Sequence, residues 1–146
     1  MPSVFSYERR VEFCETDAAG IAHFSSLILY MEQAEHALLR SLGLSVASSH
    51  TTLGNEAESA SKISWPRVKV ECEFLSPAKF EDLISVQSSV ALLGSTSIAY
   101  QHRLSIGNTL IANGKITSVC CTRANGLLSS TKIPSHVRDS LLPYLV

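Results

Sequence analysis

A carboxylate placed shortly before a predicted helix is the strongest chemical feature of this sequence. Asp17 stands in the polar segment ETDAAGIAHFSS, and an apolar helical pattern follows it. A helix start presents unpaired backbone N–H groups and the positive end of the helix dipole, so a carbonyl oxygen placed there is stabilised as it becomes an oxyanion. A nearby carboxylate can then act as nucleophile or as general base on water.

This pair of groups suits a thioester, because the leaving thiol has a pKa near ~8.5 and departs as a thiolate without a strong general acid. The same segment is also typical of a plain turn, since Asp followed by small residues and Gly20 favours turn geometry. The local pattern therefore leaves two interpretations of Asp17 open, a catalytic carboxylate and a turn residue.

Other catalytic and binding signatures are missing from the sequence. It contains no GxSxG, HExxH, GxGxxG or CxxC motif, and Ile116 follows Gly114-Lys115 where a phosphate-binding loop requires Ser or Thr. The formal net charge of -1 excludes the basic footprint of a nucleic-acid-binding protein. A small molecule or a protein is the favoured partner.

Cysteine usage and the N-terminus indicate the compartment. The four cysteines show no disulfide-framework or metal-ligand spacing, which is typical of reduced thiols. The first residues lack the layout of a signal peptide, and no apolar run approaches the ~18 residues of a membrane span. We therefore expect a cytoplasmic protein without a membrane span.

One apolar helix must position the carboxylate. From Leu27 to Leu42 the apolar residues recur at three- and four-residue steps, and Gly43 follows as a stop signal. Ser25 or Ser26 is the predicted cap. Additional apolar residues widen the face of this helix, so we expect it to lie at the centre of the fold.

Alternating patterns predict strands in most of the remaining chain. The predicted strands are residues 5–13, 67–74, 83–93, 96–106 and 110–122. A long polar connection over 45–64 with a short helical turn near 56–60, and a C-terminal helix after Pro134, complete the prediction. No repeating strand–helix units occur, so the sequence predicts a single α+β domain over residues 1–146. A long central helix wrapped by a curved antiparallel sheet of five or six strands is the hotdog fold.

Three segments resemble the 4-hydroxybenzoyl-CoA thioesterase family of hotdog proteins. They are VEFCETDAAGIAHFSSLILYMEQAEHALLRSLGL, WPRVKVECEFLSPAKFEDLISV and LLGSTSIAYQHRL, and the resemblance covers about residues 5–122. It implies an acyl-CoA thioesterase that forms homodimers with the two sheets joined edge to edge, often paired again into tetramers. It also implies acyl-CoA sites at the dimer interface and no metal or cofactor.

The resemblance assigns residues position by position. Asp17 takes the role of the catalytic carboxylate, and the backbone N–H of Phe24 takes that of the oxyanion donor. The candidate substrate-binding residues are His23, Ser26, Glu32 and Trp65. For His23 and Trp65, structural packing at the helix entry and in the core is an equally open interpretation. Ser26 stands where many members carry Asn.

One departure from the family concerns the nucleotide. Some members hold the CoA phosphates with a basic pair where this chain reads Gly94-Ser95-Thr96. Alternative phosphate contacts are the basic residues Arg67, Lys69, Lys115, Arg123 and Lys132. Two further functions stay open: a hotdog dehydratase or hydratase with His23 as base, and an acyl-thioester-binding module without catalysis. The acyl group is not identified by the sequence.

Overall fold

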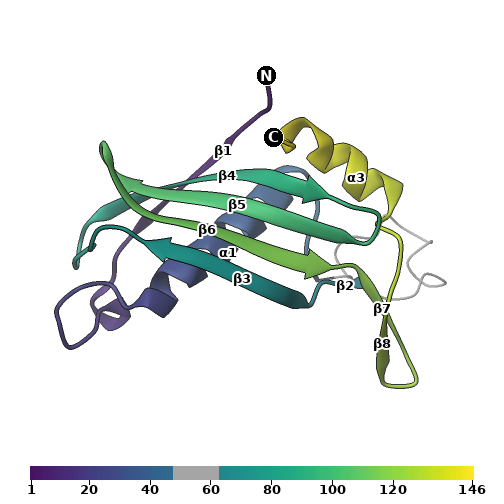
Figure 1. Cartoon of the computed structure of the whole chain (residues 1–146), viewed down its shortest axis with the longest axis horizontal. Coiled ribbons are helices and arrows are strands. Elements are labelled where there is room, and N and C mark those ends of the chain that lie inside the picture. Colours follow the sequence, from purple (N-terminus) through teal and green to yellow (C-terminus); the bar gives the residue numbers. More distant parts are fainter. Residues whose placement is uncertain (48–62) are drawn as a thin grey trace.

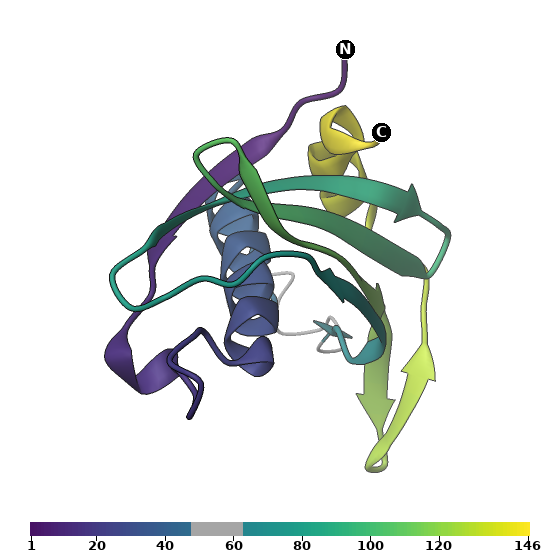
Figure 2. The ribbon, with the colours of Figure 1, turned by 60° about the vertical axis from the view of Figure 1, so that its left-hand side comes forward.

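A long helix lies in the concave face of a curved antiparallel sheet (Figures 1 and 2). The computed structural model describes residues 1–47 and 63–146. Its elements are β1 (Phe5–Arg10), η1 (Phe13–Glu15), α1 (Phe24–Ser41), β2 (Ile63–Ser64), β3 (Arg67–Phe74), β4 (Leu83–Leu93), β5 (Ser97–Ile106), β6 (Thr109–Val119), β7 (Cys121–Ala124), β8 (Leu127–Ser130), α3 (Ser135–Leu141) and η3 (Leu142–Tyr144). The helical turn predicted near 56–60 lies outside the described residues. In the part of the chain that is described, no helix is long and apolar enough to cross a membrane.

The main sheet has five strands in the order β1-β4-β5-β6-β3, all antiparallel to their neighbours. A separate small sheet has the order β2-β7-β8, and its β7–β8 hairpin projects away from the helix (Figure 2). The meander β4–β5–β6 forms the middle of the main sheet. This arrangement confirms the predicted long helix and five-stranded sheet. Among the described residues, no strand pairs with the outer edge of β3.

The buried face of α1 supplies the centre of the core. Tyr30, Met31, Ala34 and Leu38 are fully buried and pack on the inner faces of β4, β5 and β6. The three- and four-residue spacing of these side chains is the helical pattern visible in the sequence. Because this face of the helix is fully buried, side-chain packing sets the position of the helix over the sheet.

Gly114 lets the helix approach the sheet closely. A Cβ at this position of β6 would lie 2.5 Å from Sδ and 2.7 Å from Cε of Met31, and 3.2 Å from the backbone oxygen of Glu71. These separations are below van der Waals contact. Met31 therefore fills the space that a side chain at position 114 would occupy.

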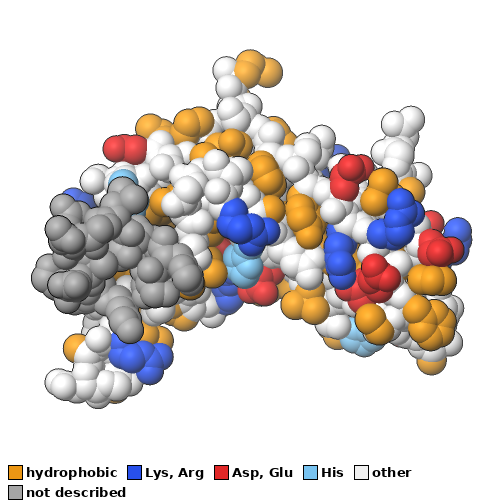
Figure 3. Space-filling model, turned by 180° about the vertical axis from the view of Figure 1, so that it is seen from behind, with side chains coloured by type: hydrophobic (Ala, Val, Ile, Leu, Met, Phe, Trp, Pro, Cys, Tyr) orange, Lys and Arg blue, Asp and Glu red, His pale blue; other side chains and the backbone are white. Residues whose placement is uncertain are grey.

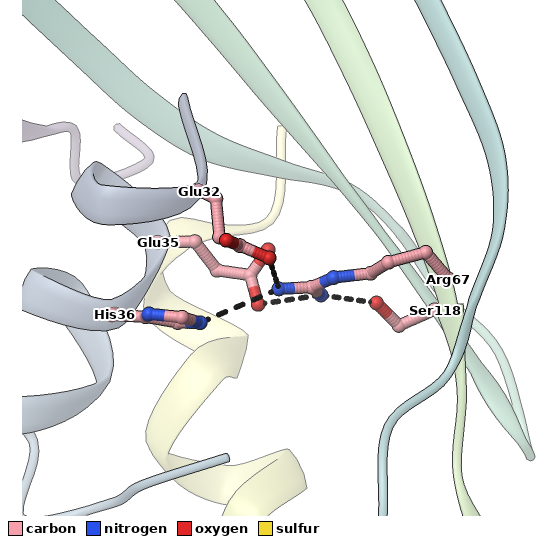
Figure 4. Close-up of polar contacts among 5 residues, drawn as sticks. All are labelled: Glu32, Glu35, His36, Arg67 and Ser118. Carbon is pink, nitrogen blue, oxygen red and sulfur yellow. Dashed lines mark hydrogen bonds and ion pairs between the residues drawn. The ribbon is translucent and has the colours of Figure 1, made fainter. Parts of the chain in front are cut away.

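A group of charged side chains ties the C-terminal half of α1 to β3 (Figure 4). The guanidinium of Arg67 donates hydrogen bonds to the carboxylate of Glu35, at 2.8 Å, and to Ser118, and it contacts Glu32 at 3.3 Å and His36 at 3.5 Å. Glu35 is 1% exposed. Burial raises the pKa of the Glu35 carboxyl to about 7, although the positive charge of Arg67 opposes the shift.

Two predicted element ends are wrong. The first strand stops at Arg10 and not at residue 13, and Phe13 lies in η1, exposed and in contact with the ring of Phe80. The helix starts at Phe24, and His23 caps it in place of Ser25 or Ser26. The Ser26 hydroxyl instead donates to the carbonyl of Glu15, which leaves it unavailable as a cap.

The strand predicted over residues 110–122 is divided in the structure. β6 ends at Val119, and Cys120 leaves the main sheet, with its N–H donating to the carbonyl of Thr96 and its carbonyl accepting from Thr131. β7 and β8 then form a hairpin around Asn125 and Gly126, which both have positive φ. The sequence prediction missed β8.

Replacing Gly114 by Ala should destabilise the protein by about 1–3 kcal/mol, because the added methyl overpacks the contact with buried Met31. Urea unfolding measures the change. Shortening Met31 to Ala should cancel part of the penalty, so the two substitutions should be non-additive. An undiminished penalty of the Gly114→Ala change in the Met31→Ala background would contradict the proposed contact.

Replacing Glu35 by Gln should change how stability depends on pH. The native carboxyl has a pKa of about 7 against an ordinary value of 4.5, so the unfolded chain releases this proton first as the pH rises. The stabilisation from protonated Glu35 is present below pH 4.5 and is lost towards pH 7. The free energy of unfolding of the wild type, relative to Glu35→Gln, should fall across this interval by up to the order of 3 kcal/mol. A constant or rising difference in urea unfolding would contradict this.

Candidate active site

The loop between η1 and α1 fixes the carboxylate of Asp17 by one of its two oxygens. Oδ1 accepts hydrogen bonds from the N–H groups of Ala19, at 2.8 Å, and Ile21, at 3.4 Å. Gly20 takes φ of 80°, a conformation that favours glycine, and donates to the Asp17 carbonyl. The turn interpretation of this segment is therefore correct. Among the hydrogen bonds of the described residues, none engages Oδ2, which leaves this oxygen free for chemistry.

The start of α1 offers a backbone donor beside this carboxylate. His23 caps the helix, and its Nδ1 accepts from the N–H of Ser25 at 3.2 Å. Phe24 is the first residue of the helix and has no helical carbonyl four positions before it. No hydrogen bond within residues 1–47 and 63–146 uses the Phe24 N–H as donor. The helix dipole of 18 residues adds positive potential at this point.

Asp17 and Phe24 line one cleft of about 450 Å³. The remaining lining residues are almost all apolar: Ile21, Ala22, Leu27, Phe74, Leu75, Ser76, Pro77 and Ala78. The Phe24 ring meets the ring of Phe74 edge to face, with centroids 6.2 Å apart. The loop, the helix start and the end of β3 therefore supply the lining of one largely apolar cleft, and this lining includes Asp17 and Phe24.

The structure places the other predicted substrate-binding residues outside this lining. The Nδ1 atom of His23 contacts the hydroxyl of Ser25, and its ring packs on Phe24 with centroids 4.5 Å apart. Ser26 is 6% exposed and bonds to the carbonyl of Glu15. Both residues thus lie beside the cleft and shape the helix start.

Glu32 lies further along α1, and Trp65 lies between β2 and β3. Glu32 belongs to the group around Arg67 (Figure 4), and Trp65 lines a small cavity together with Glu35 and Tyr100. Within one chain, the structure does not bring these two residues to Asp17. Arg67 itself is engaged by carboxylates, and Lys69 pairs with Glu71 at 3.0 Å. None of the five candidate phosphate contacts lines the cleft.

Sequence reasoning missed Glu15, which lies two residues before Asp17. Its side chain is 15% exposed and pairs with Arg9 of β1. The only sequence signal was the position of Glu15 just after the predicted first strand. A carboxylate that becomes largely buried there requires hydrogen-bond or ion-pair partners. Those partners come from separate elements, so local spacing did not reveal them.

Comparisons with known proteins agree with this architecture. The family model of the thioesterase-like superfamily matches residues 11–141. The acyl-CoA thioester hydrolase YbgC of Escherichia coli is 24% identical over 119 residues, which are 81% of this chain and 82% of that protein. The 1,4-dihydroxy-2-naphthoyl-CoA hydrolase of Synechococcus elongatus is 23% identical, over 97% and 94% of the two chains.

A solved gentisyl-coenzyme A thioesterase superimposes with a TM-score of 0.74 and 29% identity, covering 93% of this chain and 98% of its own. The similarity spans both α1 and the sheet, and it confirms the hotdog fold and the resemblance noted in the sequence. The chain therefore belongs to the thioesterase-like superfamily of hotdog-fold enzymes.

Proposed function

We propose that this chain hydrolyses an acyl-CoA thioester, with Asp17 as the reacting carboxylate and the N–H of Phe24 as the oxyanion donor. The observation that carries the proposal is that Asp17 and Phe24 line the same largely apolar cleft. Among the described residues, one oxygen of the Asp17 carboxylate and the N–H of Phe24 have no hydrogen-bond partner. The carboxylate supplies reactivity, and the N–H stabilises the negative charge that develops on the carbonyl oxygen.

Two routes use these groups. In the nucleophilic route, Oδ2 of Asp17 attacks the carbonyl carbon, the C–S bond breaks with release of CoA thiolate, and water then hydrolyses the mixed anhydride. In the general-base route, Asp17 accepts a proton from water as that water adds to the carbonyl, and the thiolate leaves. Both routes need only water as co-reactant, and both place the developing oxyanion at Phe24.

The acyl group is proposed to be apolar, either aliphatic or aromatic. Besides Asp17 and Ser76, the cleft residues have apolar side chains. Related proteins named for their substrates act on 1,4-dihydroxy-2-naphthoyl-CoA and gentisyl-CoA, and we extend the CoA thioester class to this chain. All four cysteines are free thiols, which supports the cytoplasm as the compartment of action.

The alternative activities find less support in the geometry. A hydratase or dehydratase needs a base in the cleft, and His23 does not line it. A binding module without catalysis has no need of a carboxylate oxygen left unengaged beside a free N–H.

We further propose that two copies pair through the free edge of β3. Val68, Val70 and Phe74 are 60%, 46% and 49% exposed on this edge strand. An exposed apolar edge strand is a template for pairing with another chain. Hydrophobic side chains also lie among charged ones on the face opposite to that of Figure 1 (Figure 3). Pairing at β3 would cover the exposed side chains of Val68, Val70 and Phe74.

Charge complementarity selects one antiparallel register. With Val70 on the two-fold axis, Lys69 of one copy faces Glu71 of the other, and the reverse pair forms by symmetry. If Glu71 instead lay on the axis, it would face its own copy, and like charges directly opposite are destabilising. In the favoured register, residues near the start of one β3 lie opposite residues near the end of the other, where Phe74 lines the cleft.

Replacing Asp17 by Asn or Ala should lower thiol release from the preferred acyl-CoA at least 100-fold, because the reacting oxygen is lost. Acetyl-, palmitoyl- and benzoyl-CoA serve as the substrate panel in a colorimetric thiol assay. Asp139→Asn, an exposed carboxylate on α3, is the control and should keep wild-type activity. Near wild-type rates in both Asp17 variants would refute the assignment, whereas saturable binding by a wild type that releases no thiol would favour the binding module.

Lys69→Glu and Glu71→Lys should each weaken the dimer about tenfold, since each places like charges opposite one another twice. Mixing the two single variants should restore association, because one chain then carries two acidic and the other two basic residues at these positions. Sedimentation velocity measures the association, and Arg103→Glu on β5 is the matched control. Unchanged dimers in the single variants, or no recovery on mixing, would exclude this register.

A further inference from the structure

The carboxylate of Glu15 is not part of the cleft lining, and it joins three elements. It accepts hydrogen bonds from the hydroxyl of Tyr30 on α1 and from the N–H of Glu12, each at 2.8 Å. It also forms an ion pair with Arg9 of β1. The Arg9 guanidinium lies over the ring of Tyr30, 5.1 Å from its centroid. Both carboxylate oxygens of Glu15 are therefore engaged by groups of the protein.

The backbone carbonyl of Glu15 holds the start of α1. It accepts from the N–H of His23 and from the hydroxyl of Ser26, each at 2.9 Å. These donors stand on either side of Phe24 in the chain. Glu15 is also only two residues before Asp17. One residue thus joins the loop that carries the carboxylate to the helix turn that carries the free N–H.

We propose that Glu15 is the positioning residue of this site, holding Asp17 and the N–H of Phe24 at the separation that the reaction requires. The inference rests on the function proposed above. Its physical basis is that a fixed near-attack geometry supplies much of the rate, and a displacement of about 1 Å can cost on the order of 100-fold. Arg9 and Tyr30 act through Glu15 by fixing its side chain.

The alternative role for Glu15, as a second reacting carboxylate, does not fit its surroundings. It does not line the cleft, and its oxygens are occupied. Burial acts to raise the pKa of the Glu15 carboxyl, but hydrogen bonds from Glu12, Tyr30 and Arg9 outweigh it and hold the pKa below its ordinary value. A carboxylate held in this form stays charged and paired, which suits a fixed structural tie.

The test compares Glu15→Gln and Tyr30→Phe with wild type by steady-state kinetics on the preferred acyl-CoA, with thermal unfolding of each variant. Glu15→Gln keeps the shape of the side chain and removes its charge. Tyr30→Phe removes one hydroxyl from a fully buried ring and keeps its packing. Glu8→Gln, an exposed carboxylate on the same strand as Arg9, is the control.

Positioning predicts that kcat falls at least tenfold in Glu15→Gln and about threefold in Tyr30→Phe, with KM within twofold of wild type. The rate is expressed per folded molecule. A kcat per folded molecule equal to that of wild type, or a loss confined to KM, would overturn the role. If Glu15→Gln does not fold, Tyr30→Phe decides by the same criteria. A wild type inactive on every thioester would instead refute the proposed function, and the positioning role with it.

Discussion

The close packing of α1 into the concave sheet is the contact on which the rest of this structure depends. The helix presents a fully buried row of side chains to β4, β5 and β6, and Gly114 provides the space for Met31. Because interiors are packed at near-crystalline density, the helix axis has little freedom once this row is seated. The position of its first residue, Phe24, is therefore determined by contacts that lie well inside the core.

The two ends of the helix use charged groups in different ways. At the N-terminal end, Glu15 ties the Asp17 loop to the first turn and leaves the Phe24 N–H unpaired. Along the C-terminal half, the buried Glu35–Arg67 pair joins the helix to the edge strand β3. The first arrangement shapes one side of the proposed active-site cleft. The second joins the helix to the strand whose far end, at Phe74, lines the same cleft.

The sequence allowed prediction of the features that depend on local pattern or on a local motif. The helical spacing from Leu27 predicted α1, and alternation located the meander. The sequence made Asp17 the candidate for the reacting carboxylate because its segment resembles the family signature, and the structure shows that the same segment is a turn. His23 was not recognised as the cap, since histidine is an unusual cap and the nearby serines are common ones. Whether a residue pairs with a distant element is invisible to local spacing, which is why Glu15 was missed.

Glu32 and Trp65 were predicted to bind substrate, but the structure of one chain places them away from the cleft. Their assignment to the acyl pocket followed the family pattern, yet within one chain they lie with Arg67 and with a separate small cavity. The exposure of Val68 and Val70 could not be predicted from the sequence either. Alternation shows which residues share a face of a strand, but it does not show whether another element covers that face. Pairing of two β3 strands would explain why apolar residues are retained there.

The central claim is that Asp17 and the Phe24 N–H act on one thioester carbonyl. A crystal structure of the Asp17→Asn variant soaked with benzoyl-CoA tests it most directly. The account predicts the thioester oxygen at about 2.7–3.1 Å from the Phe24 nitrogen, with the carbonyl carbon within about 3–3.5 Å of the residue 17 side chain. A benzoyl group bound away from this cleft, or a carbonyl oxygen turned away from the helix start, would contradict it.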